Sequence, residues 1–176
     1  MEIAIFASYW CARPVFAHAA GRADNVVVAE SPWWSNEDIT NMNNVFGAGN
    51  FTAYTSYAGA TPASIFNPSN RFVFLEGGAS TDINWLAYLS GNASTILNWV
   101  NSGGALLLMS AGWDPGTYTL GPGNLRQDNY LNASPSGTLT RAGTAAFTFE
   151  PTLTTQSGNY LAHDFVTGTG LTVHGR

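Results

Sequence analysis

Two apolar runs separated by a helical segment constrain the fold of this chain most. Residues 71–76 and 105–110 are almost continuously apolar, as expected of strands that are covered on both faces. Between them, apolar residues recur at helical spacing over 85–100, and Gly103-Gly104 ends the helix, with a bend or break expected at Gly91-Asn92. A strand, a helix and a second buried strand imply a right-handed crossover, so the sequence predicts a parallel sheet.

Two more strands and two more helices are predicted upstream. Residues 25–31 form a β-branched run, and residues 51–57 alternate in a way that suits a strand nearer the sheet edge. Glu37 and Asp38 favour the first turn of a helix that ends near Gly47, and Thr61-Pro62 opens a short helix. We therefore expect an α/β fold, a three-layer sandwich with a mostly parallel sheet. In the order 2-1-3-4, the strand order would reverse between the first and third strands.

The two ends of the chain are expected to differ from this core. From about residue 113 the pattern changes to turns and short Thr-rich strands, which predicts a C-terminal antiparallel β extension within a single domain over 23–176. Residues 1–22 are interpreted as a leader: an atypical signal peptide ending near Ala17-His18-Ala19, or a disordered segment, with an extra strand at 3–6 as the alternative. A secreted or extracytoplasmic location is expected.

Composition excludes several classes of function. None of the six basic residues is a lysine, so P-loop and Schiff-base chemistry is excluded. Cys11 is the single cysteine, which rules out a disulfide within the chain and a Cys-rich zinc site. The net charge of -5, without a basic cluster, argues against nucleic acid. No apolar run reaches the roughly 18 residues of a membrane span. With so few cations, we expect a neutral small molecule or a glycan as partner.

The central block resembles a known superfamily. The run FVFLEGG at 72–78, the helix around Trp85, NWVNSGG at 98–104 and the strand at 106–108 are similar to the class I glutamine-amidotransferase-like proteins, which have a flavodoxin-like fold. The similarity covers roughly residues 25–112, and the rest looks like a β region added in secreted bacterial members. Catalytic members carry a Cys in the sharp turn after the third strand, where this chain has Glu76 to Ser80. The resemblance thus implies the scaffold without its nucleophile, and not a glutamine amidotransferase.

A ligand site is predicted where the strand order reverses, between the strands that end at Glu30 and Glu76. Glu76 follows four apolar residues, so burial should raise its pKa and suit it to acid–base catalysis. The alternative is a structural carboxylate that accepts N–H bonds from the Gly77-Gly78 turn or pairs with Arg71 or Arg126. The neighbouring loops supply the residues expected to bind substrate: Glu30, Ser31, Trp33, Trp34, Gly77, Gly78 and Trp113. The tryptophans would stack on a sugar or another flat ligand, unless they simply cover the core.

Three further residues are candidates for catalysis. Ser110 ends a buried strand and could be a nucleophile, but it lacks a G-x-S-x-G elbow, which favours a plain strand-end Ser. His163 and Asp164 form the best acid–base pair by composition, but adjacent side chains point in different directions, and a structural His is the alternative. Asp114 and Asp128, with Asp164, could give calcium its oxygen ligands, if they are not simply solvated loop acids.

Two hypotheses about function follow. The first is a small secreted hydrolase that cleaves an ester, lactone or amide bond, using Glu76, Ser110, His163 and Asp164, with calcium as a candidate cofactor. The second is a non-catalytic glycan- or protein-binding module, an adhesion domain with a degenerate amidotransferase-like site. The absence of the nucleophilic Cys favours the second, and the convergence of titratable groups on one edge of the sheet favours the first.

Overall fold

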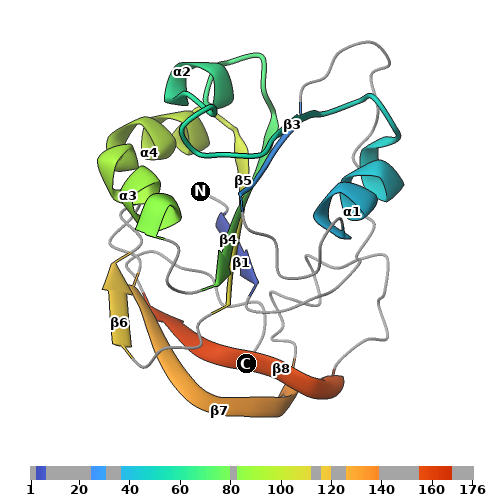
Figure 1. Ribbon diagram of the computed structural model, residues 1–176, viewed down its shortest axis with the longest axis vertical. Coiled ribbons are helices and arrows are strands. Elements are labelled where there is room, and N and C mark those ends of the chain that lie inside the picture. Colours follow the sequence, from blue (N-terminus) through green and yellow to red (C-terminus); the bar gives the residue numbers. More distant parts are fainter. Residues whose placement is uncertain are drawn as a thin grey trace.

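The centre of the molecule is a parallel sheet with the strand order β1-β5-β4-β2-β3 (Figure 1). The computed structural model describes residues 3–6, 25–30, 37–79, 83–111, 116–119, 126–138 and 155–167. The strands of this sheet are β1 (Ile3–Phe6), β2 (Asn25–Ala29), β3 (Thr52–Tyr54), β4 (Phe72–Ala79) and β5 (Ala105–Ala111). Strands β2 to β5 have the order 2-1-3-4, so the predicted α/β fold with a parallel sheet is confirmed.

Helices cover both faces of this sheet (Figure 1). Helix α1 (Glu37–Phe46) lies on one face, and α2 (Pro62–Ile65), α3 (Ile83–Gly91) and α4 (Ala93–Asn101) lie on the other. Thr61 caps α2 by accepting the Ser64 N–H at 3.3 Å. The expected break at Gly91-Asn92 separates α3 from α4, and the Asn92 side chain donates to the Tyr88 carbonyl at 2.8 Å. None of the helices that the structure describes could span a membrane.

The core has two parts because successive strand residues point to opposite faces of the sheet. The part under α1 contains Val27 of β2, Phe74 of β4, and Met42 and Phe46 of the helix. The part under α2, α3 and α4 is larger, and its sheet residues are Val26, Val28, Val73, Leu75, Leu106 and Leu108. Along each strand, alternate side chains therefore pack into the two parts of the core. The same alternation fixes the face of the sheet on which a polar residue at the strand end lies.

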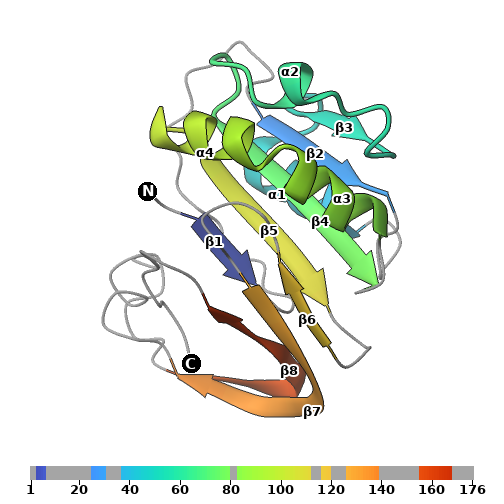
Figure 2. The same cartoon turned by 90° about the vertical axis from the view of Figure 1, so that its left-hand side faces the viewer.

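The described remainder of the chain forms a second sheet. Strands β6 (Gly116–Thr119), β7 (Arg126–Thr138) and β8 (Thr155–Thr167) pair antiparallel in that order. Figure 2 shows this sheet beyond the carboxyl ends of β4 and β5. A complete three-layer sandwich that carries this sheet as an extension stays a prediction, and the short strand expected at 145–149 lies outside the described residues.

Strand β1 pairs parallel with β5, from Ile3 beside Leu106 to Phe6 beside Met109. This is the arrangement given above as the alternative for residues 3–6. The leader interpretation of 1–22 and the domain boundary at 23 stay predictions, since residues 7–24 lie outside the part of the chain that the structure describes.

Candidate active site at the carboxyl edge of the parallel sheet

Glu76 lies in the middle of the sheet, at the end where β2 and β4 part. Its backbone pairs with Ala29 of β2 and with Met109 of β5, and the residue is only 1% exposed. Because Phe74, two residues earlier, belongs to the core part under α1, Glu76 lies on the same face. A carboxyl group that is removed from water favours its neutral form, which suits it to exchange protons.

The strand does not turn at Gly77-Gly78 as expected. Instead β4 continues to Ala79, with a shift of register against β5 between Glu76 and Ala79. A Cβ atom on Gly77 would lie 2.9 Å from the Trp85 ring, so the missing side chain serves the packing of α3 on the strand. The predicted sharp turn is therefore wrong at this position, because the glycine serves a close approach and not a change of chain direction.

The Tyr57 hydroxyl compensates for the irregularity in β4. It donates a buried hydrogen bond of 2.6 Å to the backbone carbonyl of Glu76, at the position where the regular pairing with β5 stops. Sequence reasoning placed Tyr57 at the end of a strand, whereas it lies in the turn that follows β3. The hydroxyl thereby fixes the backbone that carries the candidate acid.

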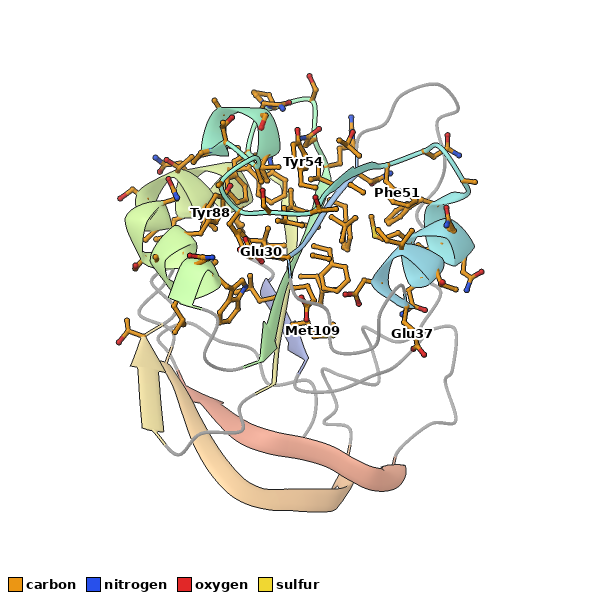
Figure 3. All side chains as sticks on the ribbon, in the orientation of Figure 1. Glu30, Glu37, Phe51, Tyr54, Tyr88 and Met109 are labelled. Atoms are coloured by element: carbon orange, nitrogen blue, oxygen red, sulfur yellow. The ribbon has the colours of Figure 1, made fainter. Side chains whose placement is uncertain are left out.

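Glu30 lies on the opposite face from Glu76. Its carboxylate accepts the Tyr57 N–H at 2.6 Å and the Asn84 side-chain amide at 2.7 Å. Figure 3 shows Glu30 and Tyr88 on the side of the sheet that carries α3. The two bonds tie the segment after β3 to α3 at the switch point. A substrate contact of Glu30 stays a prediction.

Asp38 is a buried acid whose position the sequence did not reveal. It was expected only to favour the first turn of α1, but it is 4% exposed and lies on the same helix face as Met42 and Phe46. Burial, and secondarily the charge of Glu37, raise the pKa of Asp38 to about 6. The spacing of four residues from Asp38 to Met42 and from Met42 to Phe46 was the signal that could have found it.

Tyr88 of α3 is buried in the part of the core under α2, α3 and α4. Its ring lies 5.0 Å from that of Tyr57 and 6.4 Å from that of Phe66, measured between centroids. Its hydroxyl is buried and has no hydrogen-bond partner among the described residues. Burial, with a smaller contribution from Tyr54, raises the pKa of Tyr88 above its usual range, so the hydroxyl stays protonated.

For the other predicted site residues, the structure describes at most the backbone. Ser110 follows Met109 in β5, and Gly78 lies in β4. His163 and Asp164 lie in β8, and Asp164 pairs with Asn129, directly after Asp128 of β7. The structure describes the backbone of these residues and not their side chains. Outside the described residues lie Ser31, Trp33, Trp34, Trp113 and Asp114.

Arg71 and Arg126 were predicted as alternative ion-pair partners of Glu76. Arg71 directly precedes β4, five residues before Glu76, so the two lie about 16 Å apart along the extended strand and do not form an ion pair. Arg126 is the first residue of β7, and the structure describes its backbone but not its side chain. The part of the chain that the structure describes contains no group of three or more His, Cys, Asp or Glu side chains that could hold a metal ion.

A groove lies at the opposite, amino end of the sheet. It encloses about 460 Å³ between α2, the C-terminal end of α4 and the residue before β4. Its walls combine polar and aromatic side chains: Phe66, Pro68, Asn70, Arg71, Thr95, Asn98, Trp99 and Ser102. Sequence reasoning missed this groove because its residues come from three separate elements.

Comparisons with protein-family models, with curated proteins and with solved structures give no match for this chain. The amidotransferase-like classification therefore stays a prediction that depends on the residues quoted for it. The geometry around Glu76 is independent of that classification.

Proposed function

We propose that this chain is a small secreted hydrolase that cleaves an ester, lactone or amide bond of a neutral small molecule. The observation that carries the proposal is Glu76, a carboxyl group 1% exposed at the switch point of a parallel sheet. Such edges are where open α/β sheets bind their ligands, and Glu side chains are almost never fully buried unless they are paired. The scaffold would be amidotransferase-like and would lack the nucleophilic Cys.

In the proposed reaction Glu76 transfers protons between water, the substrate and the leaving group. Ser110, in the strand beside Glu76, would hold or attack the substrate carbonyl. The antiparallel sheet beyond the carboxyl ends of β4 and β5 supports a contribution from His163 and Asp164 of β8 (Figure 2). Calcium, if it takes part, would be held by Asp114 and Asp128 and would polarise the substrate carbonyl.

The proposal is tested with the full chain on a panel of activated esters, lactones and amides, with and without calcium. We expect turnover of at least one neutral substrate, and a large loss of turnover in His163→Ala without a change of the melting temperature. Absence of turnover by the wild-type protein on the whole panel, in both conditions, would refute the hydrolase.

A non-catalytic glycan- or protein-binding module is the second candidate, and the amino-end groove favours it. Asn98, Thr95 and Ser102 offer hydrogen-bonding groups there beside Phe66 and Trp99, a combination that suits a sugar or a polar peptide segment. On a glycan array, Asn98→Ala should weaken binding while Glu76→Gln leaves it unchanged. If Glu76→Gln abolishes the binding instead, the ligand occupies the carboxyl edge and this reading fails.

A further inference from the structure

The groove at the amino end of the sheet contains a positive charge that no described residue neutralises. Arg71 directly precedes β4, lines the groove and is exposed. Its backbone carbonyl accepts the Ala105 N–H at 2.9 Å, which holds it at the amino ends of β4 and β5. Its guanidinium group has no hydrogen bond or ion pair with another described residue. The N–H donors of Arg71 are therefore available to a ligand in the groove.

The electrostatic surroundings of Arg71 favour an anion. No Asp or Glu is among the described residues that line the groove, although the whole chain has a net charge of -5. The C-terminal end of α4 also borders the groove, and its dipole carries about half a negative unit charge. The last carbonyls of α4 are occupied, since Trp99 accepts the Gly104 N–H at 3.1 Å and Val100 accepts the Gly103 N–H at 3.0 Å. The full charge of Arg71 therefore outweighs this helix end.

One face of α4 and its cap adds polar groups to the groove. Thr95, Asn98 and Ser102 are spaced by three and four residues, so they are neighbours on the same helix face, and all three are exposed. The side chains of Thr95 and Asn98 have no hydrogen bond to another described residue. The Ser102 hydroxyl donates to the Asn98 carbonyl at 2.8 Å, so its oxygen can still accept. These groups can both donate to and accept from the hydroxyl groups of a ligand.

The aromatic residues form the base of the groove. Phe66 is 7% exposed and Trp99 is 6% exposed, and their rings pack edge to face with centroids 5.5 Å apart. The Trp99 indole N–H donates to the carbonyls of Asn67 and Asn70, each at 3.2 Å. Both rings are thus held by the protein and offer little surface for stacking. Recognition in this groove therefore depends on its charged and polar groups.

We propose that the groove binds an acidic sugar, whose carboxylate pairs with Arg71 and whose hydroxyl groups bond to Thr95 and Asn98. This inference rests on the glycan-binding module given above as the second candidate function, and it names the class of glycan. A carboxylate matches the planar fork of a guanidinium group and accepts parallel N–H bonds from it. The groove volume of about 460 Å³ lies within the range of small-molecule sites. A neutral partner was expected from the scarcity of cations, and Arg71 makes this groove the exception.

The test compares the methyl glycosides of glucuronic acid and glucose, which differ only in the carboxylate or hydroxymethyl group at the C6 carbon. Each is titrated into the full-length protein while nitrogen-15 NMR follows the backbone amides. The glucuronide should shift the signals of Arg71, Asn98 and Ser102 saturably and bind about tenfold more tightly than the glucoside. Added salt should weaken the binding of the glucuronide and not that of the glucoside.

Arg71→Gln should weaken binding of the glucuronide about tenfold and leave the glucoside unchanged, whereas Arg71→Lys should retain part of the preference. The Arg71 side chain has no described partner, so both variants should keep the wild-type melting temperature. Arg126→Gln is the matched control, because it removes the same charge from β7, in the sheet beyond the carboxyl ends of β4 and β5 (Figure 2). It should leave both affinities within about twofold of the wild type.

Equal affinities for the two sugars would overturn the acidic sugar and leave the glycan-binding module standing. If neither sugar gives saturable shifts, the module and the acidic sugar both fail. An equal loss in Arg126→Gln, or shifts centred on Glu76, would also overturn the proposal. A short peptide rich in Asp and Glu is the third probe. If it binds at the groove and the glucuronide does not, the ligand is a protein segment and the proposal is wrong.

Discussion

Replacing Asp38 with Asn should stabilise the protein at neutral pH and leave its stability unchanged at pH 4. Burial raises the pKa of Asp38 from 3.8 to about 6, so the folded protein binds more protons than the unfolded chain between these values. The free energy of unfolding therefore falls as the pH rises from about 4 to about 6, and the loss persists above pH 6. The Asn variant has no carboxyl group at this position, so it escapes this loss.

The size of the effect follows from the same shift. One pH unit corresponds to about 1.4 kcal/mol, which sets an upper limit of about 3 kcal/mol for Asp38. The N-terminal dipole of α1 and the remaining contact of the carboxyl group with solvent offset part of this energy. We expect Asp38→Asn to be more stable than the wild type by about 1–2 kcal/mol at pH 7.

Urea denaturation at pH 4, 5, 6 and 7 measures this difference directly. The control is Glu37→Gln, since Glu37 is the exposed neighbour in the same helix turn. Its effect should be small at every pH. A difference between Asp38→Asn and the wild type that is the same at pH 4 and pH 7 would refute the reasoning. So would a variant that is less stable than the wild type at pH 7.

Three further substitutions test the packing that positions the site. Gly104→Ala should lower the free energy of unfolding by about 2–3 kcal/mol, because a Cβ atom would collide with the Trp99 ring. Gly91→Ala meets no atom within 4 Å and should be neutral or stabilising, so equal melting temperatures of the two variants would contradict this packing. Gly77→Ala should lower the free energy of unfolding by about 1–3 kcal/mol, because the added Cβ atom would crowd Trp85 and Met109. An unchanged urea midpoint would count against that packing. Tyr57→Phe should lower the free energy of unfolding by about 1–2 kcal/mol, because it removes the hydroxyl that donates to the Glu76 carbonyl. If calorimetry shows no loss of stability, the bond is dispensable.

The parallel sheet could be predicted because its strands are buried on both faces. Residues of β2, β4 and β5 read as continuous apolar runs, and the glycines after α4 mark its end. Gly103 has a φ of 101°, the left-handed conformation that favours glycine at a helix end. These runs and the right-handed crossover predict a parallel sheet. The order 2-1-3-4, which places Glu76 at the switch point, was only a condition of the site prediction, and the structure has this order.

The role of single residues at the edge could not be predicted, because it depends on contacts between distant segments. Gly77 has the sequence signature of a turn, yet its small size is used for the contact with Trp85 of α3. Tyr57 donates to Glu76, 19 residues further along the chain. Asp38 has the signature of a helix-start residue, and only the packing of α1 on the sheet buries it. In each case the local sequence pattern says nothing of the residue's tertiary partner.

The most direct test of the account is the turnover of Glu76→Gln compared with that of Glu37→Gln, on any substrate that the wild type cleaves. Gln keeps the size of the buried side chain but cannot exchange a proton, and Glu37 is an exposed acid at the start of α1. We predict that Glu76→Gln lowers kcat/KM by about 100-fold or more at an unchanged melting temperature, while Glu37→Gln stays within about twofold of the wild type. Full activity of a folded Glu76→Gln variant would contradict the placement of the active site at this edge of the sheet.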